Sequence, residues 1–226
     1  MKKALLTFGI VMVAALAVRA DTIADWTFET SQPATAGPIT PEVGAGSGLG
    51  NHAGAAVYSS PSGNGSVHSW SANLWAVGDY WQFSVNTTTF SNLQLSWDQA
   101  GSSTGPKDFR LAYSSDGGST FTDFSTYTVI LSGFSTGSTN TAATHSFDLS
   151  GVTALNNNAN VVFRLIDNST NAIGGSTAGV GTGGTDRVDN FTVTATAAVP
   201  EPSVIGMVAL GTALVVGAIR HRKGKA

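Results

Sequence analysis

The chain of 226 residues contains no cysteine. It therefore has no disulfide framework, no thiolate metal ligand and no cysteine nucleophile, and a folded domain must be held by its hydrophobic core. The four histidines, at positions 52, 68, 145 and 221, show no spacing typical of a metal site. These absences argue against a zinc enzyme, a cysteine enzyme and a histidine-based triad.

Positive charge is scarce between residues 21 and 198. This segment, called the body below, has four cationic residues against thirteen acidic ones, a net charge of −9, whereas the whole chain carries −3. The cations of the body are Lys107, Arg110, Arg164 and Arg187. An acidic body repels the phosphates of nucleic acid and an anionic membrane surface, so neither is an expected partner. Neutral sugars, cations or simple solubility fit this charge better.

The N-terminus has the pattern of a secretory signal peptide. Lys2 and Lys3 precede an apolar run over residues 4–18, and small residues follow at positions 18 and 20. This pattern predicts a signal peptide over residues 1–20, cut by signal peptidase between Ala20 and Asp21. The alternative is an N-terminal membrane anchor, for which the apolar run is short.

The last 28 residues, 199–226, consist of three consecutive parts. Residues 199–203 contain Pro200, Glu201 and Pro202, and the two prolines keep this peptide extended and outside any helix. Residues 204–219 are uncharged and predict a transmembrane helix of about 24 Å, short against a bilayer core of about 30 Å. Residues 220–226 are basic and should stay on the cytoplasmic side. The body would then lie outside the inner membrane.

This three-part tail resembles the PEP-CTERM sorting signal of Gram-negative bacteria. The family's motif corresponds to Pro200, Glu201 and Pro202, its membrane stretch to residues 204–219 and its basic end to residues 220–226. The resemblance implies that an exosortase recognises the motif and cuts the tail. It also implies an exported protein, tethered to the inner membrane during sorting and then placed at the cell surface or in an extracellular matrix with exopolysaccharide. The alternative is an ordinary C-terminal anchor that is not cut.

Alternation of apolar and polar residues predicts an all-β body over residues 21–198. The expected strands cover residues 23–29, 80–85, 92–100, 109–114, 127–131, 145–149, 161–166 and 187–196. The run 161–166 is apolar except for Arg164 and predicts a central strand. No segment of the body has a sustained helical period, so we expect a single β-sandwich or jelly roll.

Turn signals separate the expected strands. Asp116 and Gly117 predict a hairpin turn over residues 115–119. The glycine-rich segments 37–50 and 174–184 are expected to be irregular surface loops. The body also resembles the jelly-roll-type domains of other PEP-CTERM proteins in three pieces, residues 24–29, 103–106 and 184–191, and this resemblance implies a fold without an activity.

Two carboxylates are candidates for a structural calcium site. Asp189 shares parity with Phe191 and Val193, so it should point toward the core, where an unpaired carboxylate is costly. Glu29 ends the first expected strand, and jelly-roll carbohydrate-binding modules often bind calcium between a first-strand carboxylate and a last-strand aspartate. We therefore consider a Ca²⁺ ion held by Glu29, Asp189 and loop carbonyls. The alternative is that Asp189 caps the loop that enters its strand or pairs with an arginine, Arg164 or Arg187.

Aromatic residues suggest a possible sugar contact. Core packing is the favoured interpretation of Trp70, Trp75 and Trp81, because tryptophan supplies much of the core of a β-sandwich. The alternative is that Trp70 and Trp75, which lie among serine, asparagine and glycine, are exposed and stack on sugar rings, whereas Trp81 is buried. Acids that could serve a glycosidase by type alone are Asp98, Asp108, Asp116 and Asp123, of which Asp116 is better explained by its turn. No catalytic residue is assigned.

The features of the two ends and the body together favour one function over two others. We predict an exported, non-catalytic cell-surface or matrix protein. The first alternative is a carbohydrate-binding module of the same matrix, and the second is a glycan-active enzyme.

Overall fold

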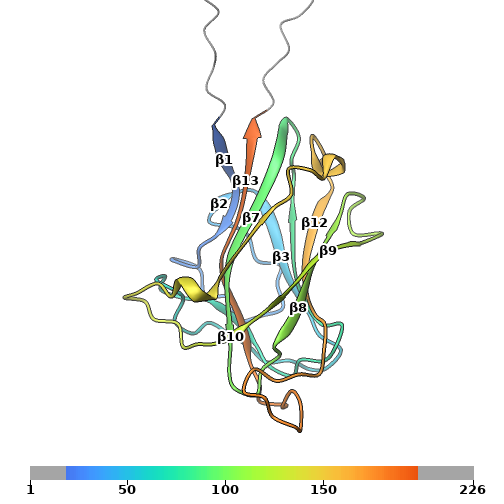
Figure 1. Ribbon diagram of the computed structural model, residues 1–226. Helices are drawn as coiled ribbons and strands as arrows, with labels where there is room; N and C mark the ends of the chain where they lie inside the picture. Colours follow the sequence, from blue (N-terminus) through green and yellow to red (C-terminus); the bar gives the residue numbers. More distant parts are fainter. Residues whose placement is uncertain (1–18, 198–226) are drawn as a thin grey trace, which may run out of the picture.

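The structure is a computed structural model that describes residues 19–197, which form a β-sandwich (Figure 1). The strands are β1 (Ala20–Trp26), β2 (Val43–Gly44), β3 (Gly46–Asn51), β4 (Tyr58–Ser59), β5 (Trp70–Ala72), β6 (Tyr80–Val85), β7 (Phe90–Gly101), β8 (Asp108–Ser114), β9 (Thr122–Thr128), β10 (Ile130–Leu131), β11 (Thr144–Asp148), β12 (Val161–Asp167) and β13 (Asp186–Ala197). Two short 3-10 helices are η1 (Thr141–Ala143) and η2 (Thr153–Leu155).

Several predicted features lie outside the described residues. These are most of the signal peptide, the Pro200-Glu201-Pro202 motif, the transmembrane helix 204–219 and the basic tail. Between residues 19 and 197, no helix has the length and apolar character needed to cross a bilayer.

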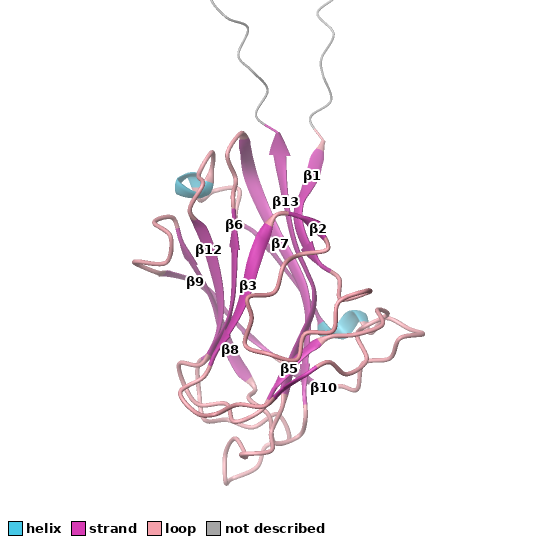
Figure 2. Ribbon diagram, turned by 180° about the vertical axis from the view of Figure 1, so that it is seen from behind, coloured by secondary structure: helices cyan, strands magenta, loops and turns pink. Residues whose placement is uncertain are grey.

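The strands form two facing sheets (Figure 2). The larger sheet has the order β10-β7-β13-β1-β2, with β11 beside β7, β5 beside β13 and β4 beside β5. The smaller sheet has the order β3-β6-β12-β8-β9. Every pairing is antiparallel except that of β10 with β7. The predicted central strand 161–166 corresponds to β12, in the middle of the smaller sheet, so that prediction is confirmed.

Aromatic side chains from both sheets fill the core between them. Phe83 of β6 stacks on Phe191 of β13 with ring centroids 3.7 Å apart, which joins the smaller sheet to the larger. Trp26 packs edge-on against both rings. All five tryptophans are buried. Because such rings remove large apolar areas from water, this core stabilises the sandwich without disulfides.

The glycine-rich segment 37–50 does not form the irregular loop expected from its composition, and that prediction is wrong. It contains β2 and β3, and β3 pairs with β6 along its whole length. Gly46, Gly48 and Gly50 alternate along β3 and face the core, where large rings approach the backbone. A Cβ at Gly46 would lie 2.8 Å from the ring of Trp26, and one at Gly50 would lie 2.6 Å from the ring of Tyr58. Glycine is needed here for space.

The first strand ends at Trp26, three residues earlier than predicted. Phe28 has φ 50°, and the chain then turns around the carboxylate of Glu42. That carboxylate accepts hydrogen bonds from the Thr27 hydroxyl, from the Thr30 hydroxyl and from three backbone N–H groups in residues 29–31. Burial alone would raise the pKa of Glu42, but these donors lower it to about 2. Glu42 therefore fixes the loop that carries Glu29.

The predicted hairpin turn at residues 115–119 is confirmed and joins β8 to β9. Gly117 and Gly118 have φ values of 76° and 91°. The carboxylate of Asp116 accepts from the Ser114 hydroxyl and from the backbone and hydroxyl of Thr120. Because these hydrogen bonds join residues before and after the turn, they hold the next residue, Phe121, in a fixed position over the smaller sheet.

Candidate functional site

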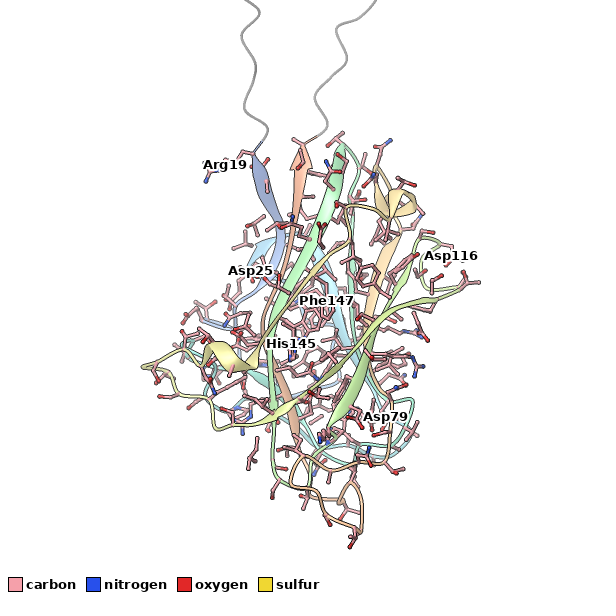
Figure 3. All side chains as sticks on the ribbon, viewed as in Figure 1. Arg19, Asp25, Asp79, Asp116, His145 and Phe147 are labelled. Carbon is pink, nitrogen blue, oxygen red and sulfur yellow. The ribbon has the colours of Figure 1, made fainter. Side chains whose placement is uncertain are left out.

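A cleft of about 270 Å³ lies at one end of the sandwich. It is lined by Trp75, Ala76, Val77, Asp167, Ser169, Thr170, Ala178, Gly179 and Val180. These residues come from the turn before β6, from the end of β12 and from the glycine-rich loop 174–184. The carboxylate of Asp79 accepts hydrogen bonds from the backbone N–H groups of Ala76 and Ala53, which stabilises the turn before β6. Asp79 lies at the end of the sandwich away from Arg19 (Figure 3).

The glycine-rich loop 174–184 forms one wall of the cleft. It is irregular and largely exposed, as predicted. Backbone hydrogen bonds from Val180 to the Thr170 carbonyl and from Gly181 to the Thr104 carbonyl attach it to the body. Gly179 has φ +75°, and a Cβ there would lie 2.8 Å from the Thr170 carbonyl oxygen. Glycine at this position therefore lets the loop pack closely enough to form the wall.

Asp167 supplies the carboxylate of the cleft. Its side chain is buried, and its Oδ1 accepts a long hydrogen bond of 3.4 Å from the Ser169 amide. Its Oδ2 has no hydrogen-bond partner among the described residues. Burial, and then the neighbouring charges of Asp79 and Asp108, raise the pKa of Asp167 to about 6. A buried acceptor without a donor is costly, so a donor that reached this oxygen would be stabilising.

Trp70 and Trp75 are both buried, so the favoured interpretation of core packing is confirmed and the alternative of an exposed pair is wrong. Trp70 is fully buried, donates its indole N–H to the Thr35 carbonyl and packs 4.5 Å from the Trp81 ring. Trp75 is 6% exposed and packs against Trp81 and Phe109. The large apolar area of each ring favours the core. Of the two, only Trp75 lines the cleft.

Asp189 is buried, but it does not face the core between the sheets as its parity predicted. Asn190 has φ 50°, and the pairing of β13 with β7 shifts register there. This bulge reverses the alternation, so Val188 and Phe191 both face the core, while Asp189 lies opposite Asp98 on the outer face of the larger sheet. Parity arguments hold only along an unbroken ladder.

The loop over residues 63–68 covers Asp189 and also contacts Glu29. Asp189 Oδ2 accepts from the Asn64 amide and the Ser66 hydroxyl, both at 2.6 Å. Burial raises the pKa of Asp189 to about 7 despite these donors. Glu29 Oε2 accepts from the Val67 amide at 3.2 Å. Glu29 and Asp189 thus hold one loop. The alternative placed Asp189 against the loop that enters its own strand, whereas the loop that it caps is 63–68.

The groups that contact these two carboxylates are N–H and O–H donors, whereas calcium is bound by several oxygen lone pairs directed at one point. Between residues 19 and 197, no group of three or more acidic or histidine side chains could hold a metal ion. The calcium hypothesis stays a prediction, which equal melting temperatures in EDTA and in millimolar calcium would contradict.

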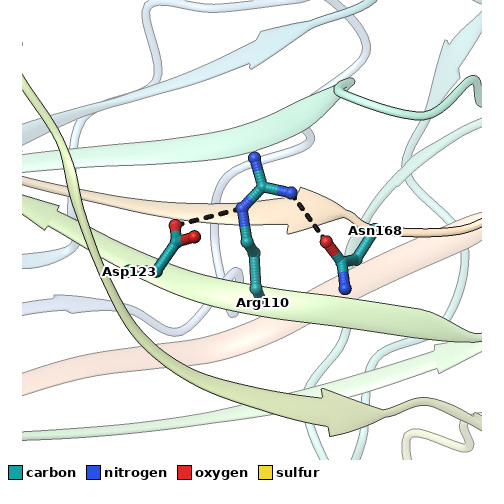
Figure 4. Close-up of polar contacts among 3 residues, drawn as sticks. All are labelled: Arg110, Asp123 and Asn168. Atoms are coloured by element: carbon teal, nitrogen blue, oxygen red, sulfur yellow. Dashed lines mark hydrogen bonds and ion pairs between the residues drawn. The ribbon is translucent and has the colours of Figure 1, made fainter.

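The four acids considered for a glycosidase are each held by different neighbours. Asp98 accepts from Thr144 and Asn190, Asp108 from Ser169 and Asn171, Asp116 from its own turn, and Asp123 from Arg110. In the Arg110 contact, Nε lies 3.1 Å from Asp123 and Nη1 lies 2.7 Å from Asn168 (Figure 4). Among the described residues, no two of these carboxyls share a hydrogen-bond partner.

Sequence reasoning missed Asp167 as a site residue. An acid directly after the apolar run 161–166 is a signal that could have identified it, because a polar residue at the end of a central strand lies at a rim of the sandwich. Nothing in the sequence indicated that the glycine-rich loop would close around it, since that contact joins residues brought together only by the fold.

No protein-family model matches the chain, and no curated protein matches it in sequence. The PEP-CTERM resemblance of the tail therefore stays a prediction.

Solved structures resemble the body at low sequence identity. The tandem CBM22 domains of Xyn10C from Paenibacillus barcinonensis are 11% identical over 83% of this chain and 50% of that chain, with a TM-score of 0.49. The CBM22-1–GH10 modules of Clostridium thermocellum Xyn10B, in complex with xylohexaose, are 11% identical over 77% of this chain and 28% of theirs, with a TM-score of 0.47.

A third similar structure is the K1 cleaved adhesin domain of Lys-gingipain from Porphyromonas gingivalis, 11% identical over 75% of this chain and 95% of that domain, with a TM-score of 0.44. The chain spans half or less of the two xylanase chains that it matches. These similarities concern the β-sandwich fold and indicate no activity for this chain.

Proposed function

We propose that the chain is a non-catalytic carbohydrate-binding protein and that the cleft around Asp167 is its sugar site. The observation that carries the proposal is the buried, unpartnered Oδ2 of Asp167 in a cleft that Trp75 also lines. A carboxylate accepts strong hydrogen bonds from ligand hydroxyls. The apolar side chains of Val77 and Val180 supply a wall for the C–H face of a sugar ring.

The dimensions and charge of the cleft limit the chemical class of ligand that it can bind. Its volume of about 270 Å³ lies just below the range of about 300 to 1,000 Å³ that holds drug-sized ligands, so it suits one sugar residue at a chain end. Asp167 lies near Asp79 and Asp108, which repel anions. A neutral terminal sugar of the surrounding exopolysaccharide is therefore the ligand class that we propose.

Binding to neutral glycans should depend on the cleft. We expect Asp167→Asn, which removes the charge of the acceptor, and Ala178→Trp, which fills the cleft from its exposed rim, each to weaken binding at least ten-fold. The matched control is Gly183→Trp, because Gly183 is exposed in the same loop, lies outside the lining and has no atom within 4 Å of its Cβ position. Affinities of the full-length protein are measured by titration calorimetry after a glycan array selects the probe. Equal affinity in all three variants, or no glycan bound, would refute the proposal.

We also propose that this binding domain is exported and sorted through its C-terminal tail, in the outer layer of a Gram-negative bacterium. Ala20 pairs with Thr196, so the two ends of the described body lie side by side, at the end of the sandwich opposite Asp79 (Figures 1 and 3). A body tethered through its C-terminal end would direct the cleft away from the inner membrane. This arrangement supports a role in contacting exopolysaccharide.

Processing at the two termini should be visible in the mature protein. We expect mass spectrometry of the native protein to find Asp21 at the N-terminus and no residues beyond the Pro200–Pro202 region. In a strain lacking the exosortase, we expect the C-terminal residues 204–226 to be retained. A tail that is intact in both strains would contradict processing and leave the ordinary membrane anchor.

A further inference from the structure

Arg164 lies on the outer face of the smaller sheet, held between two aromatic rings. It projects from β12, the central strand, between Gln82 of β6 and Ala112 of β8. Its guanidinium carbon lies 3.9 Å from the centroid of the Tyr80 ring and 3.8 Å from that of Phe121. Tyr80 comes from β6, and Phe121 follows the fixed hairpin turn, so both rings have rigid supports.

The hydrogen bonds of Arg164 leave most of its donors free. Its Nε donates to Gln82 Oε1 at 2.8 Å, which fixes the rotation of the guanidinium plane. Within residues 19–197, the Nη groups of Arg164 have no hydrogen-bond partner, and the ion pair of this face is formed by Arg110 with Asp123. Arg164 is therefore an oriented cation without an acidic neighbour, on a body that carries thirteen acids.

This arrangement is specific to arginine. A guanidinium stacks on aromatic rings through its flat faces and presents two parallel N–H groups at its edge, which match the two oxygens of a carboxylate. Arg164 is partly buried, which removes its charge from part of its water and lowers its pKa. An anion that binds at the free edge would offset that loss.

We propose that Arg164, with Tyr80 and Phe121, forms a second binding site, for the carboxylate of an acidic sugar in a polysaccharide. The carboxylate binds the Nη edge in a bidentate manner, and the ring edges of Tyr80 and Phe121 contact the sugar. Gln82 positions the guanidinium. This site lies on a sheet face, whereas the neutral-sugar cleft lies between loops at the end of the sandwich. The two sites therefore act on different chemical classes of glycan.

The test is binding of oligogalacturonate to the full-length protein, measured by calorimetry at low and high salt. We expect Gln82→Glu to weaken binding at least ten-fold. The new carboxylate pairs with the Arg164 guanidinium and so competes with the ligand, while the stacking of Arg164 on Tyr80 and Phe121 is preserved. Arg164→Lys should have a similar effect, since lysine lacks the planar pair of donors. The matched control is Arg110→Lys on the same face, where the arginine is already paired with Asp123, and we expect less than a two-fold change.

The outcomes distinguish the proposed acidic-sugar site at Arg164 from the proposed neutral-sugar site in the cleft. Asp167→Asn should leave oligogalacturonate binding unchanged, and Gln82→Glu should leave neutral-glycan binding unchanged. No binding of oligogalacturonate at millimolar concentration, or equal binding by the wild-type and Gln82→Glu proteins, would overturn the proposal. If dextran sulfate bound more tightly than oligogalacturonate, and if the same variants lost that binding, the assignment of the site to a carboxylate would be overturned. A melting curve of each variant establishes that it is folded.

Discussion

Replacing Gly46 by valine is expected to lower the free energy of unfolding by about 2 to 4 kcal/mol, which corresponds to a melting temperature lower by roughly 5 to 12 °C. A Cβ at this position would lie 2.6 Å from the Ser84 carbonyl oxygen and 2.8 Å from the Trp26 ring. Neither neighbour can move freely, since Ser84 belongs to the paired strand β6 and Trp26 is in the core. Valine would therefore separate β3 from the sandwich.

The matched control for this substitution is Gly54→Val. Gly54 is exposed, and no atom lies within 4 Å of its Cβ position. We expect the control to change the melting temperature by less than about 2 °C, as surface substitutions usually do. If Gly46→Val melted at the temperature of the control, the packing of Trp26 against β3 would be disproved.

Asp186→Asn is expected to raise the stability of the protein at pH 8, and with it the melting temperature. Asp186 is fully buried at the start of β13. Its Oδ1 accepts from the Trp81 indole at 2.7 Å and from the Gln99 amide at 3.0 Å, whereas its Oδ2 has no partner among the described residues. Burial raises the pKa of Asp186 well above its usual value. Asparagine keeps the accepting oxygen and removes the buried charge.

The pH dependence gives the same prediction a second readout. A carboxyl whose pKa is higher in the folded state binds a proton there that the unfolded chain releases above about pH 4, so stability falls as pH rises. Asp167 adds the same trend between about pH 4 and its folded pKa of about 6. We expect the wild-type melting temperature to fall from pH 5 to pH 8, and Asp186→Asn to reduce that slope.

An opposite control is available at the hairpin turn. Hydrogen bonds, first from Ser114 and then from Thr120, lower the pKa of Asp116, so Asp116→Asn should lose stability at pH 8. Differential scanning calorimetry over this pH range measures all three proteins. An Asp186→Asn protein less stable than wild type at pH 8 would mean that the ionised carboxylate, rather than its neutral form, is the stabilising state.

The strand pattern could be predicted from the sequence where one face is apolar and the ladder is continuous. The expected strand 80–85 corresponds to β6, and 161–166 corresponds to β12 at the centre of its sheet, because alternation and apolar content reflect burial directly. β3 was missed because its core positions are glycines. Their alternation at 46, 48 and 50 is visible in the sequence, but the rings that require it, Trp26 and Tyr58, lie elsewhere in the chain.

The candidate sites could be predicted far less well than the strands. The alternative that Trp70 and Trp75 are exposed rested on polar neighbours such as the serines beside Trp70, yet Ser69 and Ser71 are themselves buried and donate to carbonyl oxygens. Asp189 was assigned to the wrong face because a bulge at Asn190 changes the alternation. Such a bulge depends on the local backbone and on the loop that packs over it.

The sequence by itself determined the all-β class of the body, the position of its central strand, its acidic charge and the expectation of export, because these follow from composition and from short-range pattern. The tertiary structure alone decided which buried carboxylate oxygens lack a partner, which glycines leave space for an aromatic ring and where Arg164 of the smaller sheet is held without an acidic partner. The cleft joins Trp75, Asp167 and Val180, and the arginine site joins Tyr80, Phe121 and Arg164. Both depend on contacts between distant segments, which only the packing of two sheets can bring together.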